Sequence, residues 1–284
     1  MVVLLLFFVA ALLGWRGTSR PSPLFDPSVV RLPDKLKPPL SRPTRDLIPE
    51  GDLPTLGVYL LGTDELGRDV FSRMLEGARV SLAVGFVAVG ISILLGVTLG
   101  GLAGYLGQRW RAVDVLFTGL VDIQLSFPTF FLILTVIALL PPSIWNVMIV
   151  IGITGWVGPA RFVRAEILSL REQEFVLAAQ SLGAGAVRLI FRHLLPNSMG
   201  PVLVSGTIGI AMAILTEAGL SFLGFGVPPP DATWGNILAD GKRYLFDAPW
   251  LTYVPGIAIL VVVLSFNLFG EGLRDALNPK LRGE

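Results

Sequence analysis

Long apolar runs without charge constrain this chain more than any other feature of its sequence. No residue between positions 80 and 108 is charged, and the run exceeds the about 20 apolar residues that a membrane-spanning helix needs. Only 15% of the 284 residues are charged, against about 25% in ordinary soluble domains. The run and the composition together indicate an integral membrane protein built from helices.

Further apolar segments predict about six spans in all. These segments cover residues 2–13, 115–140, 144–160, 199–223 and 250–270. The third ends at Pro159, and Pro128 predicts a kink inside the second. The first is short, and about 10–14 apolar residues also fit a signal-like or re-entrant segment. Because no basic region precedes it and no clear cleavage site follows, we interpret it as a first span, either lacking an upstream cytoplasmic lead or thin and poorly tilted.

The distribution of Lys and Arg predicts the orientation of the chain. With the N-terminus in the cytoplasm, the inner segments carry most of the basic residues outside the long first loop. The short outer loops then carry only Lys242 and Arg243. Basic residues gather in cytoplasmic loops, so we expect both termini and the segment around Glu174 to face the cytoplasm.

The long first outer loop is expected to have two parts. Residues 15–56 hold most of its prolines, show no helical period and are typical of an extended linker. Residues 62–82 place apolar side chains at helical spacing, with Asp64–Arg68 and Asp69–Arg73 as pairs four residues apart. This pattern predicts an interfacial helix that leads into the next span, either simply solvated or in contact with a partner.

Composition and motifs exclude several classes of function. A net charge of +1 argues against nucleic acid as a partner. The chain has no cysteine and one histidine, which excludes disulfides, thiolate metal sites and a His-rich metal centre. It has no phosphate-binding loop for ATP and no catalytic Ser/His/Asp or H-E-x-x-H motif. We therefore expect no enzyme activity, no metal and no cofactor.

A short helix is predicted outside the bilayer at residues 174–186. Residues at spacings of three, four and seven make one narrow face: Phe175, Ala178, Ala179, Leu182 and Ala186. Small side chains permit close approach of a backbone, which suits docking into the groove of a partner. Gly183 and Gly185 favour the end of the helix. From periodicity alone, a helix that packs under its own bundle stays equally open.

Four stretches carry a resemblance to a known family. AAQSLG at 178–183, followed by Leu195-Pro196, resembles the EAA loop of ABC importer permeases. Residues 62–82, 217–241 and 248–281 resemble the dipeptide/oligopeptide/nickel-type branch of that family, so the resemblance covers nearly everything from Leu61 onward. It implies an all-α, type I ABC importer permease fold with about six transmembrane helices, and the chain looks like the permease partner with the shorter outer loop.

The resemblance implies where partners bind. In that family the EAA segment is a coupling helix, which sits in a groove of a cytoplasmic ATPase subunit and carries ATP-driven motion to the spans. The implied contacts here are Glu174, Phe175, Leu177, Ala178, Ala179, Leu182 and Gly183. The family's glutamate falls at Leu177, so its polar contact is lost or is replaced, with Glu174 as the candidate.

The same resemblance implies the surroundings of the chain and a division into parts. The expected partners are ATP-binding subunits, a second permease, an extracytoplasmic binding protein and the lipid of a bacterial or archaeal inner membrane. The expected parts are residues 1–76, with the first span and outer loop, residues 77–275, the transmembrane domain, and residues 276–284, a cytoplasmic tail.

Polar residues inside the apolar runs are candidates for the translocation path. Asp122 and Glu217 are ionisable groups within predicted spans, where charge is costly, and Asn267 is a weaker candidate of the same kind. Each either lines the path or forms a buried hydrogen bond that holds two spans together.

Two other classes of function remain as alternatives to the importer permease. A self-contained secondary transporter or channel would run on an ion gradient without an ATPase, and an intramembrane enzyme would turn over substrate alone. The substrate is not readable from the residues, because peptides, nickel, glutathione and other solutes are carried by systems that this chain resembles.

Overall fold

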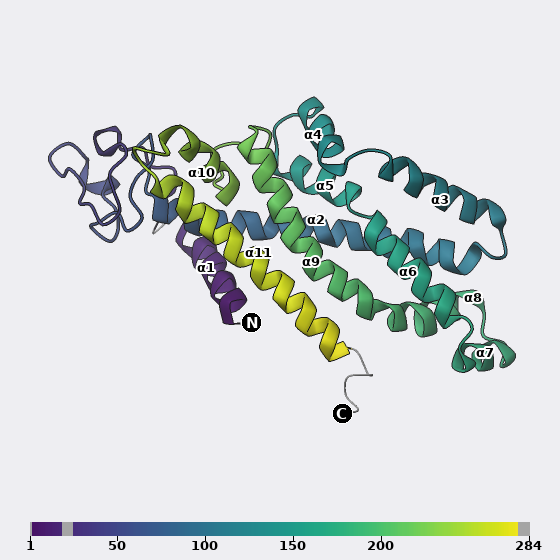
Figure 1. The fold of residues 1–284 in the computed structure, drawn as a ribbon. Helices are drawn as coiled ribbons and strands as arrows, with labels where there is room; N and C mark the ends of the chain where they lie inside the picture. The colour runs from purple at the N-terminus through teal and green to yellow at the C-terminus, as the bar shows by residue number, and fades with distance from the viewer. Residues whose placement is uncertain (1, 19–24, 278–284) are drawn as a thin grey trace. The chain divides into compact units, whose positions relative to one another are not determined.

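Helices make up all the regular structure in the part of the chain that the structure describes. The computed structural model describes residues 2–18 and 25–277, where two isolated β-bridges are the only strand-like pairings (Figure 1). The α-helices are α1 (Val2–Thr18), α2 (Val70–Leu106), α3 (Arg111–Leu125), α4 (Thr129–Leu139), α5 (Ile144–Thr154), α6 (Val157–Leu170), α7 (Glu174–Ser181), α8 (Ala186–Leu189), α9 (Leu195–Phe222), α10 (Trp234–Gly241) and α11 (Trp250–Leu277). Short turns are η1 (Leu32–Asp34), η2 (Glu50–Asp52), η3 (Ile190–Leu194, a π-helical turn) and η4 (Lys242–Tyr244). The predicted all-α class is confirmed.

The chain forms two compact units, and each is built from several stretches of sequence. The first unit holds Met1–Gly85, Leu140–Val147 and Ala211–Ser265. The second unit holds Phe86–Leu139, Met148–Ile210 and Phe266–Glu284. The expected parts with boundaries at 76 and 275 follow the topology across a membrane, and they stay a prediction.

Four helical stretches are long and apolar enough to cross a membrane. They are Val70–Leu106, Ile144–Leu170, Ala186–Phe222 and Trp250–Leu277. A fifth is the pair α3 and α4, which is bent by 83° at a short break. Helix α1 is apolar but shorter, so the described residues hold four or five spans by length and composition, and the sixth predicted span is not established.

Two prolines have different effects from those that their positions suggest. The kink predicted at Pro128 is a full break, because α3 ends at Leu125 and α4 begins at Thr129. The predicted end of a span at Pro159 is wrong, since α6 continues through Pro159 to Leu170. Pro159 lies in the first turn of α6, where a backbone N–H has no helical acceptor, so its absence costs nothing there.

A ridge of small residues lets α2 pack closely on α5 and α6 in the second unit. The ridge repeats every four residues: Ala88, Ser92, Gly96, Gly100 and Gly104. A Cβ atom added at Gly100 would overlap the carbonyl oxygen of Ala160, and one at Gly96 would lie 2.6 Å from Cβ of Pro159. Small residues at this spacing permit close helix contact in membranes, where helices associate by packing.

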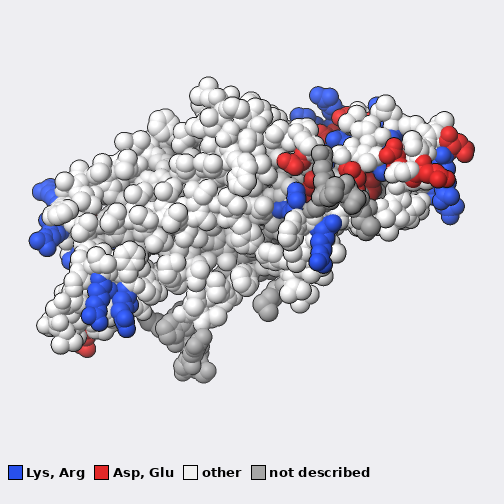
Figure 2. All heavy atoms as spheres, turned by 180° about the vertical axis from the view of Figure 1, so that it is seen from behind, with Lys and Arg blue, Asp and Glu red and all other residues white. Residues whose placement is uncertain are grey.

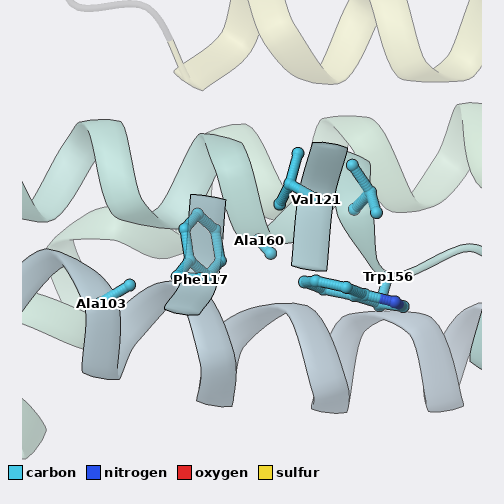
Figure 3. Packing of buried hydrophobic residues seen from close by; sticks show 6 residues of the cluster. Ala103, Phe117, Val121, Trp156 and Ala160 are labelled. Atoms are coloured by element: carbon cyan, nitrogen blue, oxygen red, sulfur yellow. The ribbon is translucent and has the colours of Figure 1, made fainter. Parts of the chain in front are cut away.

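Helix α3 joins this packing through aromatic side chains. Phe117 and Trp156 meet edge to face with ring centroids 6.2 Å apart, and Ala103, Val121, Val157 and Ala160 complete the buried cluster (Figure 3). Aromatic pairs in this geometry add about 0.5–1.5 kcal/mol beyond their area burial. The cluster therefore fixes α3 against both α2 and α6.

The outer loop of the first unit is folded around one carboxylate, so the predicted extended linker is wrong for its described residues. Asp34 is fully buried and accepts hydrogen bonds from the hydroxyls of Thr44 and Tyr59, both at 2.6 Å. The Lys37 ammonium lies 2.7 Å from the same carboxylate. A buried charge is tolerated only when it is paired and hydrogen-bonded, and this set of partners meets that need.

The Asp34 cluster makes the loop sensitive to acid. Burial alone would raise the pKa of Asp34, but Lys37, Thr44 and Tyr59 outweigh it and lower the pKa below its usual value. Because the folded pKa is depressed, the stabilisation is present at neutral pH and is lost as pH falls below about 4. We expect limited proteolysis of the loop to accelerate over that range. Asp34→Asn should be cleaved faster already at neutral pH, and an equally steep acid response in that variant would contradict the assignment.

The interfacial helix predicted at 62–82 begins later than expected. Helix α2 starts at Val70 and runs without interruption to Leu106, whereas residues 62–69 form turns. Asp69 does not pair with Arg73. Its carboxylate accepts from the backbone N–H and the hydroxyl of Ser72 at the start of α2, as a helix N-cap does.

Candidate functional site

Helix α7 is short because a glycine ends it. Glu174 lies in its first turn, where a carboxylate interacts favourably with the helix dipole. Gly183 has φ +82°, its N–H bonds Gln180 O at 2.9 Å, and Ala184 N bonds Ala179 O at 3.0 Å. These two bonds form a Schellman motif, which favours glycine at the left-handed position. The helix predicted at 174–186 is therefore too long: α7 ends at Ser181, at the first of the two glycines expected to stop it, and Ala186 opens α8 and does not share the face of α7.

One side of α7 is anchored in the core of the second unit. Val176 is fully buried in a cluster with Val163, Ile167, Leu189, Leu194 and Val202. Ala179 is partly buried against the same cluster. The predicted narrow face is therefore split, because Ala179 leans toward the chain's own core while Ala178 is exposed.

The other side of α7 presents apolar side chains outward, and we call it the α7 surface. It consists of Phe175, Leu177, Ala178 and Leu182, of which Leu182 is 90% exposed. Glu174 and Gly183 are exposed beside it. In Figure 1, α7 lies beyond the ends of α6 and α9, so within its unit no other long helix covers it. An exposed apolar surface on so small an element is typical of an interaction site.

Arg171 fixes the base of α7 to the end of α2. Its guanidinium donates from Nη1 to the carbonyl oxygens of Gly104 (3.3 Å) and Tyr105 (3.2 Å) and lies 5.6 Å from the centroid of the Tyr105 ring. The last carbonyls of a helix have no partner within it, and an arginine satisfies them well. Local sequence patterns do not reveal the role of Arg171, because its partners are distant in the chain.

A π-helical turn connects α8 to α9 and contacts α7. His193 lies in this turn, and its ring is 6.5 Å from that of Phe175, centroid to centroid. The side chain of Asn197 donates to the carbonyl oxygen of His193 at 2.6 Å. Pro196 follows the turn and cannot donate a backbone hydrogen bond, which favours the local widening of the helix.

The three residues predicted for the translocation path lie in different surroundings. Glu217 is fully buried in the first unit; its Oε1 accepts from Ser221 Oγ at 2.7 Å, and its Oε2 has no hydrogen-bond partner among the described residues. Asp122, in the second unit, is exposed, and Asn267 in the same unit is half-buried. Within the described residues of that unit, no hydrogen bond joins the last two side chains.

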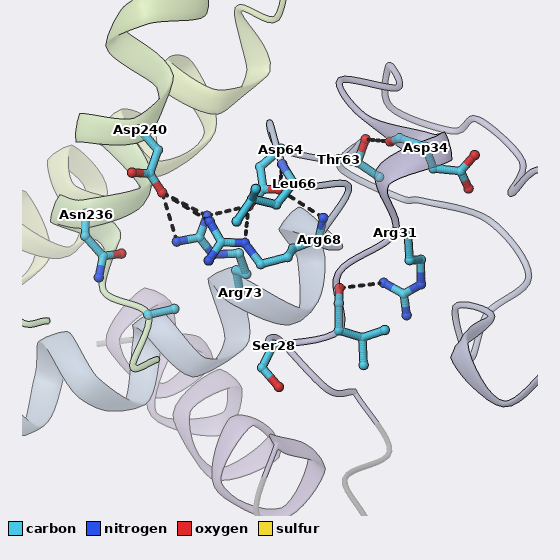
Figure 4. Close-up of polar contacts among 12 residues, drawn as sticks. Ser28, Arg31, Asp34, Thr63, Asp64, Leu66, Arg68, Arg73, Asn236 and Asp240 are labelled. Carbon is cyan, nitrogen blue, oxygen red and sulfur yellow. Dashed lines mark hydrogen bonds and ion pairs between the residues drawn. The ribbon is translucent and has the colours of Figure 1, made fainter. Parts of the chain in front are cut away.

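A cluster of two arginines and two aspartates forms a polar site in the first unit. Arg68 and Arg73 lie between Asp64 and Asp240, with Arg73 Nη1 2.7 Å from Asp64 and Arg73 Nη2 3.1 Å from Asp240 (Figure 4). These arginines border an open cavity of about 670 Å³ whose lining includes Ser221, Asn236, Asp240 and Lys242. The predicted Asp64–Arg68 pair is present at 2.7 Å, but outside any helix. The role of Asp240 was missed, because it lies far away in the sequence.

Charged side chains are unevenly distributed over the surface. On the face drawn in Figure 2 they gather in a few regions, and broad areas carry almost no charge. Several apolar spans, together with a short helix that turns apolar side chains outward, are typical of a membrane protein that presents an interaction surface.

The chain belongs to the family of binding-protein-dependent transport system inner membrane components, whose family pattern matches residues 93–283. It is 46% identical over 224 residues to the dipeptide transport system permease protein DppC of Alkalihalophilus pseudofirmus, covering 79% of this chain and 73% of that protein. It is 42% identical over 231 residues to the oligopeptide transport system permease protein OppC of Bacillus subtilis, covering 81% and 75%.

Solved structures support the fold. The inward-facing MetNI methionine ABC transporter matches with a TM-score of 0.55 at 17% identity, over 74% of this chain and 98% of that chain. An amino acid ABC transporter matches with a TM-score of 0.51 at 17% identity, over 69% and 90%. The predicted fold of an ABC importer permease is confirmed, and the relatives named above are transport permeases.

Proposed function

We propose that this chain forms half of the membrane path of an ATP-driven importer for peptides or a related small solute. The solute is delivered by an extracytoplasmic binding protein, and a second permease completes the path. The observation that carries the proposal is the α7 surface, an outward-facing apolar side on a helix whose opposite side is locked into the core. The names of the peptide-permease relatives support the substrate class.

In the proposed mechanism, α7 sits in a groove of a cytoplasmic ATP-binding subunit. The contacting residues are Glu174, Phe175, Leu177, Ala178, Leu182 and Gly183, with Ala179 at the inner edge. Val176 and Arg171 carry displacement of α7 into α6 and the end of α2, because close-packed interiors shift as bodies and do not deform smoothly. The chain binds no nucleotide itself and contributes position and shape.

The proposed orientation places both termini and α7 in the cytoplasm of a bacterial or archaeal cell whose inner membrane the chain crosses. The basic residues near α7 and at the C-terminal side support this direction. The folded outer loop around Asp34 then lies outside, where the binding protein approaches.

We propose different roles for the three intramembrane polar residues. Exposed Asp122 and half-buried Asn267 can face the path. Glu217 is buried and accepts from Ser221 within α9, which supports a structural role in that helix, and a place in the path is the alternative for it.

Glu217 substitutions separate these two roles. Glu217→Gln keeps an acceptor for Ser221, so we expect near-normal yield and uptake. Glu217→Ala removes the acceptor and should lower the free energy of unfolding by about 1–3 kcal/mol, measured as a lower thermal midpoint of the purified complex. Loss of uptake by a fully assembled Glu217→Gln complex would instead place Glu217 in the path.

The experiment that tests the proposed function is reconstitution of this chain with its ATP-binding subunits, second permease and binding protein in liposomes. We expect uptake of a labelled dipeptide only when ATP and the binding protein are both present. Nickel or glutathione as the better-transported solute would correct the substrate class. Uptake by this chain alone, driven by an ion gradient, would establish the secondary transporter and overturn the proposal.

A further inference from the structure

A second exposed surface follows α7 and has a different chemistry. Four residues of α8 and η3 form it, and we call them the basic–apolar patch: Val187, Arg188, Phe191 and Arg192. Val187 is 71% exposed and Phe191 68% exposed, and both arginines are exposed as well. Leu189 and Leu194 are buried on the opposite side, so the core fixes which way the patch faces.

The two arginines of the patch have no partner within the described chain. Neither Arg188 nor Arg192 forms an ion pair or a side-chain hydrogen bond with any described residue. Arg164 and Arg171 of the same unit differ, since Arg164 lies 2.5 Å from Asp114 and Arg171 binds backbone carbonyls.

The position of the patch along the chain places it at the edge of a span. Residues 194–216 carry no charge and are sufficient to cross a bilayer, which takes about 20 residues. Arg192 lies just before this run, and Arg188 lies one helical turn further out. Positions 187, 188, 191 and 192 share one side of a helix, so two apolar and two cationic groups face the same way.

We propose that the basic–apolar patch binds the phosphate headgroup of an anionic phospholipid. Val187 and Phe191 enter the boundary between headgroups and acyl chains, and Arg188 and Arg192 bind the phosphate oxygens. Guanidinium groups suit this ligand because their N–H groups match the geometry of phosphate. The mixture of cationic and apolar side chains favours a lipid as the ligand of this patch. The α7 surface, which we propose for the groove of the ATPase, differs because it has no basic side chain.

A lipid bound here anchors the segment between the docking helix and span α9. When α7 is displaced, the headgroup holds η3 at the membrane surface, so that movement is directed into the buried side of the unit through Leu189 and Leu194. Membranes with more anionic lipid should therefore hold this segment more firmly.

The test measures lipid binding directly and does not depend on transport. The purified full-length chain in an uncharged detergent is titrated with phosphatidylglycerol, and bound lipid is counted by native mass spectrometry. Arg188→Gln/Arg192→Gln should bind with roughly 30-fold lower affinity, equivalent to about 2 kcal/mol at about 1 kcal/mol per basic residue. The matched control is Arg42→Gln/Arg45→Gln, which removes two exposed arginines of the outer loop, away from any apolar run, and should change binding less than twofold.

Further measurements distinguish a phospholipid from free phosphate and from a protein partner. Zwitterionic phosphatidylcholine should bind much more weakly, and millimolar inorganic phosphate should not displace phosphatidylglycerol, because the apolar half of the patch needs acyl chains. Equal affinity of both double variants would show diffuse attraction and overturn the proposal. Unchanged lipid binding together with loss of the ATP-binding subunit from Arg188→Gln/Arg192→Gln would also overturn it, because the patch would then belong to the protein interface.

Discussion

Ala178→Asp is expected to remove the ATP-binding subunit from the purified complex and to reduce ATP-driven uptake by at least tenfold. Ala178 is exposed on the α7 surface, so the carboxylate meets the partner's groove and not the chain's own core. A desolvated, unpaired charge costs several kcal/mol, and about 1.4 kcal/mol corresponds to a tenfold loss in affinity. The measurements are co-purification from membranes and uptake by reconstituted vesicles.

Two further variants control this result. Ala178→Ser keeps the small volume without charge and should retain the subunit. Ala179→Asp is less diagnostic, because Ala179 packs partly against the core and the charge should also lower the amount of folded chain. Retention of the subunit and normal uptake by Ala178→Asp would remove α7 from the coupling interface.

Gly100→Leu is expected to prevent accumulation of folded protein. The ridge of α2 brings Gly100 so close to Ala160 that a single Cβ atom already overlaps the carbonyl oxygen there. Backbone atoms cannot yield as a flexible side chain does, so we expect destabilisation at or above the about 1–3 kcal/mol typical of overpacked cores. The measurement is the yield of monodisperse protein after extraction, with the thermal midpoint of whatever is recovered.

Gly90 provides the matched control in the same helix. A Cβ atom added at Gly90 meets no described atom within 4 Å, so Gly90→Leu should give normal yield. If both substitutions reduced the yield equally, general damage to α2 would be the cause. Normal yield of Gly100→Leu would mean that α2 and α6 do not pack as the structure places them.

The features predicted well from sequence depend on neighbouring residues. Apolar runs define where helices can cross a bilayer, and a glycine at a left-handed position defines where a helix stops. The helical class and the end of α7 at Gly183 follow from such local rules. The motifs along the chain carried the family resemblance, which the comparison with known permeases confirms.

The features missed or mistaken depend on residues that are distant in the chain. The folded outer loop needs Asp34 to meet Tyr59, and the polar site of the first unit needs Arg73 to meet Asp240. Spacing within one segment cannot reveal such partners. For the same reason the periodicity of α7 could not separate Ala178 from Ala179, since the neighbours of α7 decide which side is buried.

Contact between α7 and an ATP-binding subunit can be detected by cross-linking from Leu182. The chain has no cysteine, so Leu182→Cys introduces one unique thiol at a 90% exposed position of the α7 surface. Phe246→Cys is the control, at a 94% exposed position that we place outside the cell. Each variant is labelled in assembled membranes with a benzophenone maleimide and irradiated. We predict that the Leu182→Cys variant cross-links to the ATP-binding subunit and that the Phe246→Cys variant does not; absence of that product from the Leu182→Cys variant, with the complex intact, would contradict the proposed coupling role.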